Sequence, residues 1–278
     1  MTTTIGEVLR QAIAQLQGVS ATPRQDAQSI LGQVLNQPRE YLIAHAEDVV
    51  SNLQLHTFEK LLALRRNGMP LAYIIGRRAF YDRDFAINPH VLIPRPETEH
   101  IVEAALDWAK GHGPIRLVDV GTGSGVIALT LAAKLPTAQI YATDVSSAAL
   151  LVACENAANL TNVRFVQGDL LAPLRGPFDV ICANLPYIAT GEMNILDVAR
   201  FEPHVALDGG PDGLVLIRRL LEQAPSRLAT PGLLLLEMGA DQGPAVLALA
   251  QTTFPEASAR IIKDYAGLDR VVWIDRVQ

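Results

Sequence analysis

The sequence predicts an all-helical N-terminal region followed by an α/β region built on a parallel sheet, and three observations support this. In the first 75 residues, apolar side chains recur at helical spacing. From about residue 96, short apolar runs alternate with helical segments, which is typical of parallel strands with helices on both faces. Near the C-terminus, two strand-like runs at 260–263 and 270–275 predict a final antiparallel hairpin.

Start and stop signals divide the helical region. A capping box at Thr4–Glu7 starts the first helix, and Thr22-Pro23 starts the second. A third short helix follows Pro38, and a fourth ends at Asn67-Gly68. Residues 1–75 are therefore expected to form a small helical domain whose role is to dock a partner.

The rest of the chain is expected to consist of a linker and an α/β domain. Residues 76–95 alternate aromatic and charged positions and are rich in proline near their end, which predicts a hairpin linker. Within the domain at 96–278, the expected parallel strands are 115–120, 139–143, 163–167, 178–183 and 232–238. The expected helices lie near 97–110, 124–134, 146–159 and 213–229.

Composition narrows the class of protein. Hydrophobic residues make up 49% of the 278 residues and charged residues 19%, which predicts a sizeable buried core. The two cysteines exclude a disulfide framework, and no apolar run reaches the roughly 18 residues of a membrane helix. No secretory signal is visible, so we expect a soluble cytoplasmic protein. The net charge of −6 argues against a dedicated nucleic-acid binder, and the histidines show no metal-ligand spacing.

A glycine-rich loop follows the first predicted strand and reads Asp119-Val-Gly-Thr-Gly-Ser-Gly125. Strand-to-helix turns of this kind are where open α/β sheets bind ligands. A dinucleotide fingerprint would need glycine at position 126, where valine stands, and Asp119 would repel a pyrophosphate. Asp119 instead favours a cationic or hydroxyl-bearing ligand, and a tight turn without a ligand is the alternative.

Acidic residues also end the second and third predicted strands. Asp144 can accept hydrogen bonds from both hydroxyls of a ribose, although by itself it also fits a helix N-cap. Asp169 can accept from an adenine amino group while Leu170 packs on the ring, and a turn carboxylate is the alternative. With Asp119, these carboxylates indicate a positively charged nucleoside without phosphates, which describes S-adenosylmethionine.

The fourth predicted strand ends in Asn184-Leu185-Pro186-Tyr187. The Asn184 side-chain oxygen and the Leu185 carbonyl can each accept one N–H of a substrate NH₂ group and so hold it for in-line attack on a methyl sulfonium. Placement of this kind can contribute roughly 7–11 kcal/mol to catalysis. Tyr187 can pack on the flat substrate group. An Asn-Pro-type turn is the alternative interpretation of this tetrapeptide.

The chain resembles the class I S-adenosylmethionine-dependent methyltransferases and, within them, the release factor glutamine methyltransferase family. The resemblance extends over about residues 66–275. The segments on which it rests are Pro70–Gly76, Val91–Glu99, the Asp119–Gly125 loop, Asn184–Ile188, Glu202–Gly210, Asp212–Leu214 and Lys263–Arg270. Pro-Arg-Pro-Glu-Thr-Glu, at 94–99, and Glu-Pro…Ala-Leu-Asp-Gly-Gly, at 202–210, make the match specific.

This resemblance implies a Rossmann-like sheet, S-adenosyl-L-methionine as the cofactor, and methylation of a side-chain amide nitrogen. The implied substrate is the glutamine of the Gly-Gly-Gln motif in bacterial peptide chain release factors, held in part by the N-terminal domain. Together with the strand-end pattern, it gives the expected cofactor-binding residues as Asp119, Gly121, Thr122, Gly123, Ser124, Gly125, Asp144, Asp169, Leu170 and Asn184. The expected catalytic and substrate-binding residues are Asn184, Leu185, Pro186 and Tyr187, with Arg95 and Thr98 near the pocket.

The roles expected of Arg95 and Leu185 stay open in part. Arg95 fits an ion pair with Glu97 or Glu99 as well as a place near the pocket. The family typically has Asn-Pro-Pro-Tyr, whereas residue 185 here is leucine. Leucine keeps the backbone carbonyl and, because it precedes a proline, the extended conformation, so we expect activity to survive.

Three other functions remain as alternatives. A sister activity would methylate a glutamine of a ribosomal protein with the same chemistry. An adenine-N6 DNA methyltransferase shares the Asn-x-Pro-Tyr loop, but the acidic composition and the lack of an inserted DNA-reading domain argue against it. A module that binds the cofactor without turnover is the third.

Overall fold

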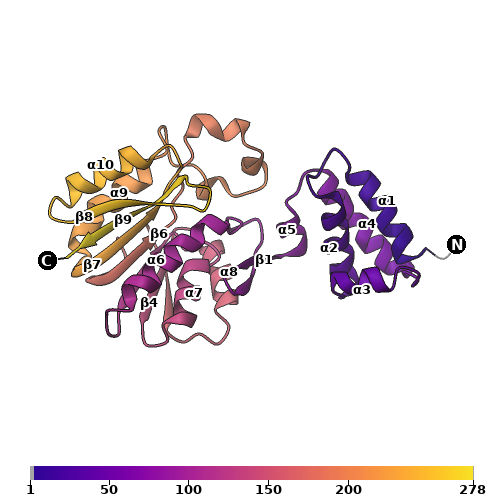
Figure 1. Cartoon of the computed structure of the whole chain (residues 1–278), viewed down its shortest axis with the longest axis horizontal. Helices are drawn as coiled ribbons and strands as arrows, with labels where there is room; N and C mark the ends of the chain where they lie inside the picture. Colours follow the sequence, from indigo (N-terminus) through magenta and orange to yellow (C-terminus); the bar gives the residue numbers. More distant parts are fainter. Residues whose placement is uncertain (1–2, 278) are drawn as a thin grey trace. The chain divides into compact units, whose positions relative to one another are not determined.

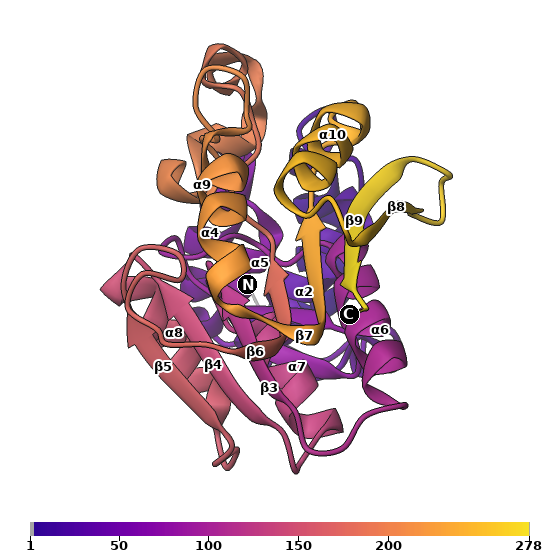
Figure 2. The same cartoon turned by 90° about the vertical axis from the view of Figure 1, so that its left-hand side faces the viewer.

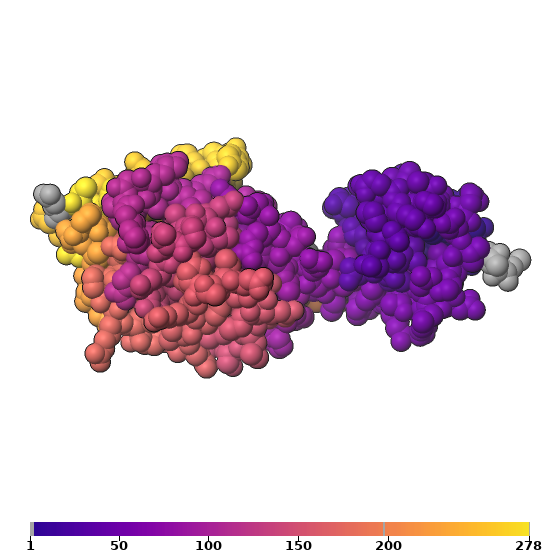
Figure 3. All heavy atoms as spheres, turned by 90° about the horizontal axis from the view of Figure 1, so that it is seen from below, coloured from indigo at the N-terminus to yellow at the C-terminus, as the bar shows by residue number. Residues whose placement is uncertain are grey.

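The structure is a computed structural model that describes residues 3–277. It divides into two compact units, Met1–Arg77 and Arg78–Gln278 (Figure 1). In the space-filling view, the first unit is coloured indigo to violet and the second runs from purple through orange to yellow (Figure 3). No helix among residues 3–277 has both the length and the apolar character needed to cross a membrane.

The N-terminal unit is all-helical. Its helices are α1 (Ile5–Leu16), α2 (Pro23–Leu35), α3 (Arg39–Ala44), α4 (Asn52–Arg66) and α5 (Leu71–Ile75). The predicted capping box is confirmed, because the Thr4 hydroxyl accepts from the Glu7 N–H while the Glu7 carboxylate accepts from the Thr4 N–H. The apolar faces of these helices meet in one core, centred on Leu16, Ile30 and Leu31.

A buried carboxylate joins two helices of this unit. Asp26 in α2 is 2% exposed and accepts from the hydroxyls of Ser20 and Thr22 and from Nε of Arg65, at 2.6 Å. Thr22 precedes α2 as predicted, but its side chain makes no cap because its hydroxyl donates to Asp26 instead. The ion pair ties the start of α2 to the last turn of α4.

A short hairpin opens the second unit. Strands β1 (Arg77–Phe80) and β2 (Arg83–Ala86) form a two-stranded sheet within the predicted linker range. The rings of Phe80 and Phe85 lie 6.1 Å apart, edge to face, and both are buried in the core of the second unit. The hairpin within the predicted linker range is therefore packed against the α/β fold.

The α/β unit contains a seven-stranded sheet in the order β5-β4-β3-β6-β7-β9-β8 (Figure 2). Its strands are β3 (Arg116–Val120), β4 (Gln139–Asp144), β5 (Val163–Gln167), β6 (Phe178–Ala183), β7 (Leu228–Glu237), β8 (Ser258–Lys263) and β9 (Asp269–Arg276). The first five pair in parallel, and β9 pairs antiparallel with both β7 and β8. The predicted fold class, with its terminal antiparallel hairpin, is confirmed.

Helices cover both faces of this sheet. They are α6 (Glu99–Ala109), α7 (Val126–Lys134), α8 (Ser147–Ala157), α9 (Val215–Gln223) and α10 (Gly243–Thr253). Consecutive strand residues point to opposite faces, so Leu117 belongs to the core beneath α6 and α7 while Val118 belongs to the core beneath α9 and α10. Helix α10, between β7 and β8, was not predicted.

Candidate active site

A pocket of about 260 Å³ lies at the carboxyl ends of the parallel strands. Parallel strands bring the residues that follow them to one edge of the sheet, so segments far apart in sequence meet there. The pocket is lined by twelve of the predicted site residues, namely Arg95, Thr98, Gly121, Thr122, Gly123, Ser124, Asp144, Asp169, Leu170, Asn184, Leu185 and Pro186. The other three, Asp119, Gly125 and Tyr187, lie outside this lining.

Three glycines shape the loop after β3. Gly121, Gly123 and Gly125 have φ values of 73°, 56° and 85°, in the left-handed region that favours glycine. A Cβ on Gly121 would come within 3.0 Å of Cδ2 of Leu185, and one on Gly125 within 2.8 Å of Cδ1 of Leu129. A Cβ on Gly123 would meet nothing within 4 Å. Gly121 and Gly125 are thus fixed by close packing, whereas Gly123 presents bare backbone to the pocket.

Asp119, near the end of β3, anchors the glycine-rich loop through hydrogen bonds. Its side chain is completely buried, and Oδ2 accepts from the Thr122 hydroxyl at 2.6 Å and from the Ala128 N–H at 3.2 Å. Burial raises the pKa of Asp119 to about 7. The other oxygen has no hydrogen-bond partner among the described residues. Asp119 therefore joins the glycine loop to the first turn of α7, and its predicted contact with a ligand stays a prediction.

Asp144, at the end of β4, faces the pocket with both oxygens anchored. Oδ2 accepts from the Gly123 N–H and Oδ1 from the Ser146 N–H, each at 2.9 Å. Burial raises the pKa of Asp144. The N-cap of α8 is Ser146, whose hydroxyl accepts from the Ala149 N–H, so the alternative of Asp144 as the cap is wrong. Each oxygen of a carboxylate has two lone pairs and can still accept one more hydrogen bond.

The segment after β5 contributes one apolar and one charged group. Leu170 is buried, lines the pocket and has a left-handed φ of 51°. Asp169 is ion-paired with Arg219 of α9, and both side chains are about half exposed. Arg219 also lines the pocket and was not predicted, because nothing in a helix sequence shows that one of its arginines meets a loop 50 residues earlier.

Asn184, after β6, has its amide held on one side. Its Nδ2 donates to the Thr98 hydroxyl oxygen at 3.0 Å, and Thr98 is only 2% exposed. Oδ1 of Asn184 therefore remains available to accept a hydrogen bond from another donor. Thr98 thus contacts Asn184 directly, whereas the sequence alone placed Thr98 only near the pocket.

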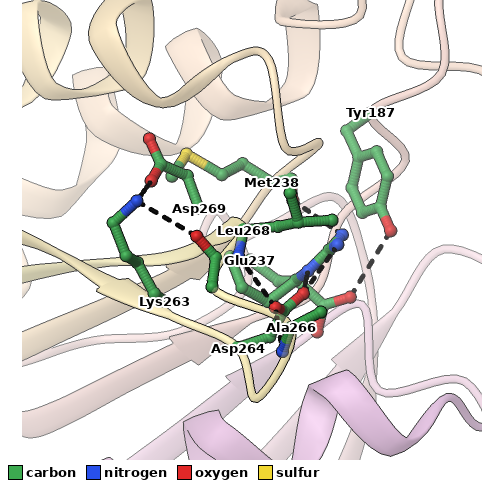
Figure 4. Close-up of polar contacts among 10 residues, drawn as sticks. Tyr187, Glu237, Met238, Lys263, Asp264, Ala266, Leu268 and Asp269 are labelled. Carbon is green, nitrogen blue, oxygen red and sulfur yellow. Dashed lines mark hydrogen bonds and ion pairs between the residues drawn. The ribbon is translucent and has the colours of Figure 1, made fainter.

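Tyr187 is not part of the pocket lining, and its hydroxyl is directed toward the buried carboxylate of Glu237 (Figure 4). Its hydroxyl donates to Oε1 of Glu237 at 3.5 Å. Burial raises the pKa of Glu237 to about 7 even though the nearby Arg270 guanidinium lowers it. Burial, together with the Glu237 charge, raises the pKa of Tyr187 to about 12. Packing of Tyr187 on a substrate stays a prediction.

Glu237 is a functional candidate that the sequence reasoning missed. It is the last residue of β7, so the strand-end rule that selected Asp144 would also have selected it. The predicted strand was extended to residue 238, which placed Glu237 inside the strand.

Arg95 forms an ion pair, but its partner differs from the one expected. Its Nη2 donates to Oε1 of Glu202, not to Glu97 or Glu99. Glu202 is 3% exposed, and its Oε2 accepts from the Ile93 N–H at 3.0 Å. This buried carboxylate therefore fixes the Pro-Arg-Pro-Glu segment from more than 100 residues away, which no local pattern could indicate.

Arg270, the second residue of β9, supplies the positive charge near Glu237. The turn that precedes β9 is organised by Asp264 (Figure 4). Oδ1 of Asp264 accepts from the N–H groups of Ala266 and Leu268, each at 3.0 Å. Oδ2 of the same carboxylate accepts from Arg270, whose Nη1 also donates to the Met238 carbonyl. The Lys263–Arg270 segment singled out in the sequence thus contributes to the site through Arg270.

Comparison with known proteins gives two family matches and many relatives. The family model described as "PrmC N-terminal domain" matches residues 7–76, and "Methyltransferase small domain" matches residues 106–201. A release factor glutamine methyltransferase from Moorella thermoacetica is 44% identical over 271 aligned positions, and the match covers 96% of this chain and 95% of that protein. One from Neisseria gonorrhoeae is 43% identical over 260 residues, with 91% and 94% covered.

A solved structure supports the fold. The 16S rRNA methyltransferase of T. Thermophilus, in complex with AdoMet and guanosine, matches with a TM-score of 0.51 and 19% identity, over 72% of this chain and 49% of that one. At this identity the likeness is evidence for the fold alone.

Substitution of the loop glycines tests the packing described above. Gly125→Ala should lower the free energy of unfolding by about 2 kcal/mol, because the left-handed φ and the contact with Leu129 both oppose a Cβ. Gly123→Ala is the matched control, since its φ is also positive but its Cβ meets nothing, and it should cost about 1 kcal/mol. Urea denaturation measures both, and equal losses would contradict the close approach at Gly125.

Proposed function

Because the chain belongs to the release factor glutamine methyltransferase family, we propose that it methylates the glutamine of the Gly-Gly-Gln motif in bacterial peptide chain release factors. The methyl group would come from S-adenosyl-L-methionine and go to the side-chain amide nitrogen. The observation that supports this best is the Asn184 amide, held by Thr98 at the edge of a pocket suited to a nucleoside. Because release factors act in translation termination, the proposal places the chain in the cytoplasm.

The residues of the pocket fit the proposed cofactor. Asp144 has lone pairs left for two ribose hydroxyls, and Leu170 offers an apolar surface for an adenine ring. The bare backbone at Gly123 leaves room that a Cβ would reduce. When bound, S-adenosylmethionine supplies a methyl group on a positively charged sulfur.

Catalysis by this chain would rest on placement of the substrate amide. An amide nitrogen is a poor nucleophile because its lone pair is delocalised into the carbonyl. Oδ1 of Asn184 and the backbone carbonyl of Leu185 would each accept one N–H of the glutamine and so turn the lone pair toward the methyl group. Methylation makes the departing proton strongly acidic, so no general base is required. Leucine at 185 keeps the acceptor carbonyl that a proline would offer.

We assign the N-terminal unit a part in holding the release factor. It forms its own compact unit and matches a family model separate from that of the methyltransferase region. A domain with its own core can bind a large protein substrate while the other unit provides the pocket for the reacting side chain.

Mass spectrometry of a bacterial release factor, incubated with the chain and S-adenosylmethionine, tests the proposed function. One added methyl group on the glutamine of Gly-Gly-Gln is expected. The control is a release factor with Gln→Ala in that motif, which should gain none. An unmodified wild-type factor, together with methylation of a ribosomal protein glutamine, would refute the proposed substrate in favour of the sister one.

Substitution of Asp144 tests the ribose contact. Asp144→Ala should weaken S-adenosylmethionine binding about 100-fold, since a hydrogen bond to a charged group contributes roughly 1.5–3 kcal/mol. Asp179→Ala is the control, because that carboxylate accepts from the Arg116 N–H near the start of β6, at the opposite end of the sheet. Isothermal titration calorimetry gives both affinities. Unchanged binding by the Asp144 variant would rule out the ribose role.

A further inference from the structure

Asn156, in α8, has no part in the function proposed above, yet its side-chain amide contacts two segments far away in the sequence. Oδ1 accepts from the Ala86 N–H at 2.7 Å. Nδ2 donates to the Ala86 carbonyl at 2.9 Å and to the Ser124 carbonyl at 3.0 Å. Ala86 ends strand β2, and Ser124 belongs to the glycine-rich loop that lines the pocket. One side chain therefore bridges the β1–β2 hairpin and this loop.

These three hydrogen bonds fix the orientation of the amide. An asparagine side chain has two N–H groups and one carbonyl oxygen, and here the oxygen faces an N–H while the nitrogen faces two carbonyls. The reversed amide would oppose donor to donor and acceptor to acceptor. A carboxylate of the same shape has no N–H, so Asn156→Asp removes the hydrogen bond to Ser124 while it can keep the one from the Ala86 N–H.

The hairpin on the other side of Asn156 is anchored to the helices of the second unit. Nη1 of Arg83 donates to the Leu129 carbonyl in α7 at 2.9 Å, and Nη2 donates to the backbone carbonyl of Asn156 in α8 at 3.4 Å. Phe80 and Phe85 are buried in the core of the same unit. The hairpin is therefore bonded to both α7 and α8 and gives the Asn156 amide a fixed partner.

Ser124 is the loop position where such support is needed. It is 3% exposed and lies between Gly123 and Gly125, whose backbones can adopt many conformations because they carry no side chain. The Gly123 N–H donates to Oδ2 of Asp144 at 2.9 Å, and Asp144 is the carboxylate assigned to the ribose. A displaced Ser124 would therefore also move the neighbouring N–H that holds Asp144.

We propose that Asn156 is a positioning residue for the cofactor, whose amide holds the Ser124 backbone against the β1–β2 hairpin and so keeps the glycine-rich loop in its binding conformation. The inference rests on the proposed function, because it takes the bound molecule to be S-adenosylmethionine. Asn156 is not part of the pocket lining, so it acts through Ser124. A loop that adopts the binding conformation only part of the time binds the cofactor more weakly in proportion.

Asn162 provides a matched control. It is also a half-buried asparagine, and its Nδ2 donates to the carbonyls of Ala132, Leu135 and Ala138 at 3.2 to 3.3 Å. These carbonyls belong to the end of α7 and the turn before β4, at the amino ends of the strands and outside the pocket lining. Loss of the Asn162 amide should therefore reduce stability, as loss of the Asn156 amide does, without a change in the glycine-rich loop.

Isothermal titration calorimetry of the full chain with S-adenosylmethionine tests the proposal. Asn156→Asp and Asn156→Ala should each raise Kd at least about tenfold, whereas Asn162→Asp and Asn162→Ala should stay within about twofold of the wild type. Urea denaturation of the same proteins shows that they are folded and compares their loss of stability. Wild-type affinity in a folded Asn156 variant, or an equal loss of affinity in the matched Asn162 variant, would overturn the proposal.

Hydrogen–deuterium exchange of the free chain gives a second readout that needs neither turnover nor cofactor. Four N–H groups of the glycine-rich loop are hydrogen-bonded within the protein, those of Gly121, Thr122, Gly123 and Gly125. They should exchange faster in Asn156→Asp and at the wild-type rate in Asn162→Asp, and unchanged exchange in Asn156→Asp would refute the role. A wild type that leaves the release factor unmodified would instead refute the proposed function, and the exchange comparison would still decide whether Asn156 holds the loop.

Discussion

Parallel pairing of β3, β4, β6 and β7 determines where the polar groups of the second unit lie, because all four strands end at the same edge of the sheet. Asp144, Asn184 and Glu237 stand at or just after three of these ends. The order of the strands places β6 beside β7, so Asn184 follows one strand and Glu237 ends its neighbour. The polar groups at this edge of the sheet thus follow from one pattern of strand pairing.

Two buried carboxylates, Asp119 and Glu237, reduce the stability of the fold at neutral pH. Burial raises the pKa of each to about 7, and each has one oxygen without a partner among residues 3–277. Since the folded state holds these protons more tightly than the unfolded state, their contribution to the free energy of unfolding falls as pH rises from about 4 to about 7. Both carboxylates hold neighbouring groups in place, because Asp119 accepts from Thr122 of the glycine loop and Glu237 accepts from the Tyr187 hydroxyl.

Local patterns predicted the elements of the fold and much of the pocket wall. Apolar periodicity is a property of adjacent residues, so the five parallel strands and the capping box at Thr4 were visible in the sequence. The partner of Arg95 was not, because Glu202 meets it only after the chain has folded. The same holds for Arg219 beside Asp169 and for Thr98 beside Asn184. Sequence reasoning therefore found the groups that face the pocket better than the groups that hold them in place.

Single-turnover kinetics of Asn184→Ala tests whether the Asn184 amide places the substrate for methyl transfer. With the cofactor and the release factor both saturating, we expect a rate about 10²–10³ lower than that of the wild type, by analogy with the loss of an oxyanion-hole donor. Cofactor affinity, measured on the same preparation, should change by only a few-fold. A single-turnover rate within a few-fold of the wild type would show that the Asn184 amide does not place the substrate.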